Sequence, residues 1–149
     1  MFKSYFDSFH LITSIISKDL YKKSLPFELL YENKTYKLIK EEEIDLGECV
    51  KVILSFNIFV DLVKDAYVIH NENKCLIYSG KVTRNKDFDL IYAEDSKEYG
   101  FVYFKNYTTF NVWSPVSKSI KIELFKNSEH YIYDLNYKKS GLWTTTIYK

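Results

Sequence analysis

The chain has 149 residues, 46% of them hydrophobic, which suffices for one ordinary domain or two small ones with a packed core. Its 21 basic and 20 acidic side chains give a formal charge of +1, so it lacks the basic stripe that a nucleic-acid partner requires. Aromatic residues make up 18% of the chain, with only four glycines and two prolines, and this composition favours β-strands.

Residues 50–60 give the clearest strand signal. Apolar side chains occupy every second position from Val50 to Val60, and Lys51, Ser55 and Asn57 lie between them. One alternative near the N-terminus is a helix over residues 4–23, which its content of Ile and Thr disfavours. Shorter strand candidates, separated by polar clusters, lie at residues 9–16, 26–33, 35–40, 66–71 and 74–83.

The composition changes at residues 84–98, where eight of fifteen side chains are charged, as is typical of a surface connection between modules. Beyond this segment strand-like runs resume. We therefore expect an all-β protein of two small antiparallel β-sandwich (immunoglobulin-like) modules, residues 1–94 and residues 95–149. The later runs lie at residues 100–104, 109–113, 119–125, 130–135 and 142–147.

Trp113 and Pro115 form a corner at the end of one run. Pro115 cannot donate a hydrogen bond to a sheet, so the strand through Val112 ends or leaves the sheet there. Phe110 and Val112 share a face, and a regular strand therefore points Trp113 to the opposite face. Two roles stay open for Trp113, namely packing and a platform on which a sugar ring stacks.

These residues resemble a motif of type I pullulanases, which belong to the α-amylase superfamily. The family pattern is Gly, then Val-Tyr, then Thr, then Phe-x-Val-Trp-x-Pro, and a later Gly-Val-Trp is similar to Gly141, Leu142 and Trp143. Residues 5–16 resemble the start of the extra N-terminal domain of cytoplasmic pullulanases. The residues that fit the first pattern are Gly100, Val102, Tyr103, Thr108, Phe110, Val112, Trp113 and Pro115.

The resemblance implies a pullulanase-type N-terminal domain followed by a partial module that is similar to carbohydrate-binding modules, with its last strands missing. The catalytic (β/α)8 barrel of such enzymes needs about 250 residues and is expected as a partner in cis, so the chain has no catalytic residue of its own. The parent enzyme would cleave α-1,6 links in pullulan, glycogen or limit dextrins. This part would be a scaffold or an accessory glucan-binding module. The alternatives are a stand-alone α-glucan-binding module and a truncated gene product without independent activity.

Aromatic side chains are the candidate α-glucan-binding residues, because flat rings stack on the apolar faces of sugars. In residues 130–137 a single strand would place Tyr131, Tyr133, Leu135 and Tyr137 on one face. We select Tyr137, Tyr131 and Trp143 as candidates, with core packing as the alternative for each. The residues expected to hold the structure are Gly100, Phe110, Val112, Trp113, Pro115 and Gly141.

Other classes of site have little support. His10, His70 and His130 are isolated in the sequence, so neither a metal site nor a cofactor is expected. Cys49 and Cys75 fit two free thiols, with a single disulfide as the alternative. No apolar run reaches the roughly 18 residues of a membrane span and the N-terminus has no signal-peptide pattern, so we expect a cytoplasmic protein with no membrane partner.

Overall fold

The computed structural model describes residues 1–93 and 99–149, which form two compact units, Met1–Phe88 and Asp89–Lys149. The predicted module boundary, between residues 94 and 95, lies outside the described residues. Both units consist mainly of β-strands, as the composition predicts. Among the helices of the described residues, none is long and apolar enough to cross a membrane.

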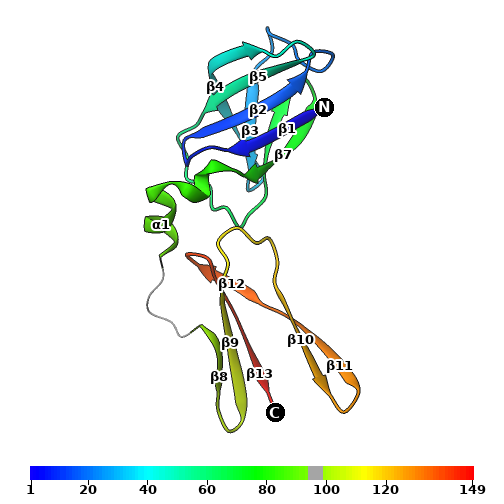
Figure 1. Ribbon diagram of the computed structural model, residues 1–149, viewed down its shortest axis with the longest axis vertical. Helices are drawn as coiled ribbons and strands as arrows, with labels where there is room; N and C mark the ends of the chain where they lie inside the picture. Colours follow the sequence, from blue (N-terminus) through cyan, green and yellow to red (C-terminus); the bar gives the residue numbers. More distant parts are fainter. Residues whose placement is uncertain (94–98) are drawn as a thin grey trace. The chain divides into compact units, whose positions relative to one another are not determined.

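The first unit is a closed seven-stranded barrel with the strand order β1-β2-β5-β4-β3-β6-β7 (Figure 1). Each of these strands pairs with a neighbour on both sides, so the sheet closes on itself. The prediction of a two-sheet sandwich is therefore wrong for this unit. The strands are β1 (Phe2–Phe6), β2 (Leu11–Ser17), β3 (Phe27–Tyr31), β4 (Lys34–Asp45), β5 (Cys49–Ser55), β6 (Ala66–His70) and β7 (Asn73–Ser79).

The strand β5 shows how the sequence pattern builds the barrel wall. Val50, Val52 and Leu54 are buried, whereas the alternate side chains are only half-buried. This alternation is the predicted one, and it separates the interior of the barrel from its outside. The strand ends at Ser55 rather than at residue 60, although Val60 is still buried in the segment that follows.

The barrel closes where β1 pairs with β7 in parallel, with Ser4 opposite Ile77. β1 also pairs with β2 in antiparallel, so the helix alternative for residues 4–23 is wrong. Ser4 and Ser14 face each other across β1 and β2, are both fully buried, and share a hydrogen bond of 2.7 Å between their hydroxyl oxygens. Each hydroxyl thus has a partner inside the barrel, as buried polar groups require.

Apart from the serine pair, the interior of the barrel is mainly aliphatic and aromatic, and His70 contributes a buried imidazole. Cys49 is half-buried and Cys75 is buried, and both are free thiols, as the first of the two alternatives predicts. The largest side chains with almost no exposed surface in this unit are Ile12, Ile16, Leu29, Leu54, Leu62, His70, Val52, Val60, Val68 and Val82.

A short 3-10 helix (Lys81–Arg84) and the helix α1 (Lys86–Tyr92) follow the barrel. The sequence predicts only a charged connection here and misses α1. Phe88 and Tyr92 are four residues apart and both are buried, so they lie on one face of the helix. The apolar residues of α1 are Phe88, Leu90, Ile91 and Tyr92. The helix has only seven residues, and so short a segment shows too little periodicity to stand out in the sequence.

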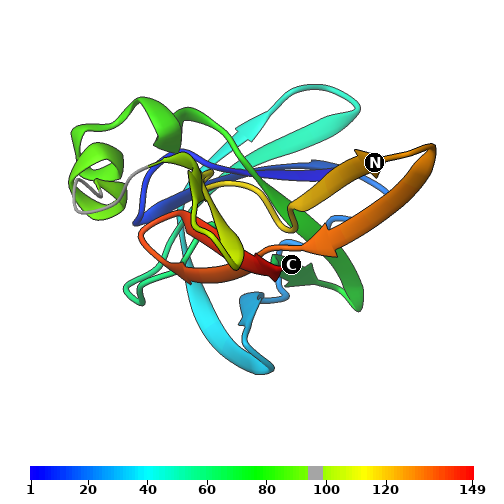
Figure 2. The ribbon, with the colours of Figure 1, turned by 90° about the horizontal axis from the view of Figure 1, so that it is seen from below.

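The second unit contains a four-stranded antiparallel sheet with the order β12-β13-β9-β8 and a separate two-stranded hairpin, β10–β11. Figure 2 shows the hairpin ribbon diverging from β8 and β9, as Figure 1 does. The strands are β8 (Gly100–Tyr103), β9 (Tyr107–Trp113), β10 (Lys121–Lys126), β11 (Glu129–Asp134), β12 (Asn136–Lys139) and β13 (Leu142–Tyr148).

The predicted single strand over residues 130–137 is wrong, because the chain changes sheets at Leu135. Leu135 lies between the end of β11 and the start of β12 and is buried. Its N–H donates to the carbonyl of Ile120 at 2.9 Å. Tyr131 therefore belongs to the hairpin, whereas Tyr137 belongs to the four-stranded sheet. A common aromatic platform on one strand face does not form.

The four-stranded sheet has two chemically different faces, which follow from its register. Side chains that are paired across neighbouring strands share a face, and successive residues alternate between faces. What we call the apolar face carries Phe101, Tyr103, Thr108, Phe110, Val112, Tyr137, Trp143, Thr145 and Ile147. What we call the polar face carries Thr109, Asn111, Trp113, Asn136, Lys139, Leu142, Thr144 and Thr146, with Val102, Tyr107 and Tyr148 toward its other end.

Candidate functional site

The residues of the predicted corner meet the turn between β12 and β13. The Ser114 N–H donates to the carbonyl of Gly141 at 2.7 Å, and the Trp143 Nε1–H donates to the carbonyl of Ser114 at 2.9 Å. Pro115 is buried, and a Cβ added to Gly141 would lie 2.9 Å from the Pro115 Cβ. Two hydrogen bonds and a close backbone approach therefore hold the corner.

Tyr137 and Trp143, two of the three candidate glucan-binding residues, lie beside each other at this corner. They are paired across β12 and β13, and their ring centroids are 5.2 Å apart with the planes at 53°. The Tyr137 hydroxyl accepts a hydrogen bond from the Gly141 N–H at 3.3 Å. Tyr137 is half-buried and Trp143 is only 6% exposed, so both rings pack at the corner.

Trp113 ends β9 on the opposite face of the sheet from Phe110 and Val112, as parity in the sequence predicts. Its Nε1–H is shared between the carbonyl of Tyr92 at 2.8 Å and the carbonyl of Ser140 at 3.2 Å. These two contacts fix the orientation of the indole. The side chain is nevertheless 43% exposed. Trp113 therefore packs through its N–H edge and still presents ring surface to solvent.

Gly100 and Tyr131 lie on other elements. Gly100 begins β8 opposite Asn111, and its φ of +93° is a conformation that glycine adopts without strain. Tyr131 is 41% exposed on β11, and its hydroxyl donates to the Glu129 carboxylate. This hydrogen bond raises the pKa of the Tyr131 phenol above its usual value. The structure thus brings Tyr137 and Trp143 together and leaves Tyr131 on the separate hairpin.

The polar face of the sheet forms a pocket of about 460 Å³ that the sequence analysis misses. The Thr144 hydroxyl donates to Asn111 Oδ1 at 2.8 Å, and the hydroxyls of Thr109 and Thr146 share a hydrogen bond of 3.2 Å. The signal in the sequence is the alternation of polar and apolar residues from Thr109 to Val112 in β9, whereas β13 has three consecutive threonines and no such alternation. The pocket is lined by Thr109, Asn111, Lys138, Lys139, Leu142 and Thr144.

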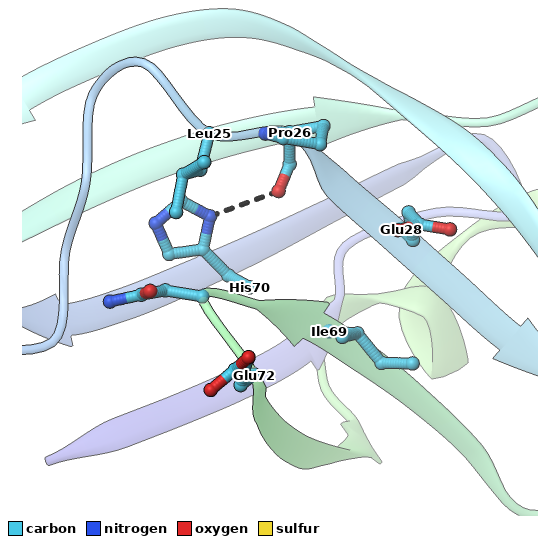
Figure 3. Close-up of a pocket in the computed structure, with 7 residues that line it drawn as sticks. Leu25, Pro26, Glu28, Ile69, His70 and Glu72 are labelled. Carbon is cyan, nitrogen blue, oxygen red and sulfur yellow. Dashed lines mark hydrogen bonds between the residues drawn. The ribbon is translucent and has the colours of Figure 1, made fainter.

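A second pocket, of about 490 Å³, lies against β3 and β6 of the barrel, beside the loop between β2 and β3 (Figure 3). The imidazole of His70 stacks on the rings of Phe27 and Tyr21, with centroid distances of 4.0 Å and 5.5 Å. The pocket is lined by Leu25, Pro26, Glu28, Ile69, His70, Asn71 and Glu72.

Both ring nitrogens of His70 contact this loop. The Lys22 N–H can only donate, so Nε2, at 3.0 Å, is the acceptor and Nδ1 carries the ring proton. Nδ1–H then donates to the carbonyl of Pro26 at 3.1 Å, the bond drawn in Figure 3. Burial lowers the pKa of this imidazole below its ordinary value. Because both nitrogens already bind the loop, His70 holds the loop in place.

No family model matches the chain. Among solved structures it is similar to the pullulanase of Anoxybacillus sp. LM18-11 in complex with maltotriose, at 28% identity and a TM-score of 0.91. It is also similar to the type I pullulanase of Bacillus subtilis str. 168 in complex with maltose, at 25% identity and a TM-score of 0.90. The Group B Streptococcus pullulanase SAP, at 15% identity and a TM-score of 0.60, shares the fold.

These matches take in both units of the chain but a small part of each relative. The first covers 99% of this chain and 22% of the Anoxybacillus pullulanase, and the second covers 99% of this chain and 21% of the Bacillus subtilis enzyme. The chain thus spans about a fifth of the length of these relatives. Over its whole length, this chain matches the N-terminal region of type I pullulanases.

Proposed function

We propose that the chain is the non-catalytic N-terminal part of a type I pullulanase, in which it acts as a scaffold or as an accessory α-glucan-binding module. The observation that carries this proposal is the match over 99% of the chain, through the barrel and the sheet unit alike. A catalytic barrel in cis would supply the two carboxylates that cleave α-1,6 links. A cytoplasmic location accompanies the proposal, because free thiols such as Cys49 and Cys75 persist in a reducing compartment.

Exposed apolar side chains of the second unit support the scaffold role. On the apolar face of the four-stranded sheet, Phe101 is 71% exposed and Tyr103 is 66% exposed. On the hairpin, Phe125 and Ile132 are also largely exposed. Soluble proteins seldom leave contiguous groups of this kind open to water, and such groups commonly mark a contact surface. We assign these surfaces to contacts with the rest of the enzyme.

The accessory glucan-binding role is supported by the solved complexes of the relatives. The Anoxybacillus enzyme was solved with maltotriose and the Bacillus subtilis enzyme with maltose. In this chain Tyr131, Tyr137 and Trp143 remain the candidates taken from the sequence. Of these, Tyr131 has the most exposed ring, whereas Tyr137 and Trp143 would contribute by supporting the corner.

The experiment that tests the proposal is a chimera. The N-terminal region of the Anoxybacillus pullulanase that matches this chain is replaced by residues 1–149, and pullulan hydrolysis and thermal melting are measured. We expect a cooperative melt and retained hydrolysis, whereas a variant that lacks the region should lose solubility or activity. A chimera that behaves like the deletion variant would contradict the proposal.

A further inference from the structure

The polar face presents rows of amide and hydroxyl groups across neighbouring strands. In one row Asn136 on β12 lies opposite Thr144 on β13, which lies opposite Asn111 on β9. On β8 the row ends at Gly100, where an added Cβ would meet none of the described residues within 4 Å. Amides and hydroxyls supply both donors and acceptors, which is the combination that sugar hydroxyls require.

Hydrogen bonds between these side chains orient the rows before any ligand arrives. Thr144 donates to Asn111 Oδ1, and Thr109 pairs with Thr146 in the next row. A hydroxyl has one proton and two lone pairs, so the oxygen of Thr144 keeps its capacity to accept from a ligand. Side chains that are fixed in advance lose less entropy when a ligand binds, and this favours affinity.

Trp113 adds a flat apolar surface to the same face. It follows Thr109 and Asn111 at alternate positions of β9, and it lies opposite Leu142 on β13. Its N–H edge is held by the carbonyls of Tyr92 and Ser140, so the ring has a fixed orientation while 43% of the side chain stays exposed. A fixed, half-exposed indole beside amides and hydroxyls is an arrangement on which the C–H face of a sugar can stack.

The charges of the pocket decide between two kinds of ligand. Lys138 and Lys139 are exposed at the pocket and can donate either to an anion or to sugar hydroxyls. Side-chain donors serve either ligand, but the acceptor oxygens of Asn111 and Thr144 are used only by a ligand that carries donors of its own, such as sugar hydroxyls. The indole of Trp113 offers nothing to an inorganic anion. The combination favours a neutral, polyhydroxylated chain.

We propose that the polar face, with Trp113 as the stacking residue and Asn111, Thr144 and Lys139 as hydrogen-bonding residues, binds an α-glucan chain. The inference rests on the accessory role proposed above and gives it a location on β9, β12 and β13. It differs from the aromatic candidates Tyr131, Tyr137 and Trp143, none of which lies on this face.

The test titrates the full chain with maltoheptaose by calorimetry and by tryptophan fluorescence. Trp143 is buried, so a fluorescence change on binding should come from Trp113 and should be lost in Trp113→Phe. Asn111→Ala and Thr144→Val should each weaken binding by about 3- to 10-fold, the usual effect of one hydrogen bond. Thr145→Val is the matched control, since Thr145 is the next residue but points to the apolar face, and it should bind as the wild type does.

The outcomes separate this site from the wider proposal. If maltoheptaose binds but Asn111→Ala and Thr144→Val leave the affinity unchanged, the site on the polar face is wrong and the accessory role stands. If inorganic phosphate displaces maltoheptaose, or binds in its place, the pocket is an anion site and the inference is wrong. If maltoheptaose does not bind at millimolar concentration, both the site and the accessory role fail, and the scaffold role is decided by the chimera alone.

Discussion

Gly141 packs so closely against Pro115 that an added Cβ would lie 2.9 Å from the proline Cβ and 3.0 Å from its Cα. Gly141 also has a φ of +79°, a left-handed conformation that residues with a side chain adopt only with strain. The backbone angle and the contact are independent reasons for a glycine here. Together they explain how the turn between β12 and β13 can lie against the corner at the end of β9.

We expect Gly141→Ala to destabilise the second unit. The left-handed backbone alone should cost about 1–3 kcal/mol, and the collision with Pro115 should add to it. Unfolding in urea measures the loss. Gly100→Ala is the control, because Gly100 has a similar φ of +93° but an added Cβ there would meet nothing within 4 Å. Equal losses in the two variants would show that the contact with Pro115 contributes nothing.

We expect Trp143→Phe to cost more stability than Trp113→Phe. The first change leaves the half-buried Ser114 carbonyl without its donor at 2.9 Å and leaves a gap where a side chain only 6% exposed was packed, for a loss of about 1–3 kcal/mol. At Trp113 the side chain is 43% exposed, so water can replace the lost N–H and the loss should stay below about 1 kcal/mol. Denaturant melts of both variants measure this, and the reverse order would contradict it.

The barrel should lose stability in mild acid through His70. The native state lowers the pKa of this imidazole below 6.5, mainly through burial, with Lys40 acting in the same direction. The unfolded chain therefore binds the proton more readily, so the contribution of His70 is fully present above about pH 6.5 and is lost as the pH falls through the native pKa. A protonated Nε2 would also face the Lys22 N–H, donor against donor.

Urea unfolding between pH 7.5 and 5 measures this dependence. His70→Phe should be less stable than the wild type at pH 7.5, because it loses two hydrogen bonds, and it should show a flatter dependence on pH. His10→Asn is the control, because His10 is exposed, and it should keep the wild-type loss in acid. If His70→Phe keeps the same slope as the wild type, another group causes the pH dependence.

The two cysteines should differ in their reaction with a thiol reagent. Cys75 is 7% exposed and its Sγ lies 3.2 Å from the carbonyl of Phe2, and burial raises the pKa of this thiol. The thiolate is the reactive form, so Cys75 should react slowly in the folded chain. Cys49 is only half-buried and should react first. The rates in Cys49→Ala and Cys75→Ala separate the two thiols, and a faster reaction at Cys75 would mean that β1 and β7 open readily.

Local patterns predict the strands well, and the long-range arrangement much less well. The alternation at Val50, Val52 and Leu54 predicts which side chains are buried, because a period of two is a property of the strand itself. Closure of the barrel depends on Ser4 pairing with Ile77, far away in the sequence, and no local pattern specifies that pair. The sequence therefore predicts strands but not whether they form a sandwich or a barrel.

The corner was predictable in part. The absence of an N–H at Pro115 and the parity of Trp113 follow from the sequence, and the structure has both the end of β9 and the position of Trp113 on the opposite face. The contacts of Trp113 with Tyr92 and Ser140 depend on the paths of two other segments. The polar face could not be predicted, because threonine and asparagine are equally typical of the solvent side of any strand, and the sequence does not show which strands lie side by side.

The parallel pairing of β1 with β7 affects how this unit can fold while it is being synthesised on the ribosome. β1 can pair with its second neighbour only after residue 79 has been synthesised, so until then the sheet that contains β1 and β2 is not closed. Non-local closure of this kind makes folding slow, and the unpaired strand edges of the nascent chain are meanwhile exposed to aggregation. The yield of folded protein should therefore depend strongly on chaperones that bind the unpaired strands, even if the completed barrel is stable.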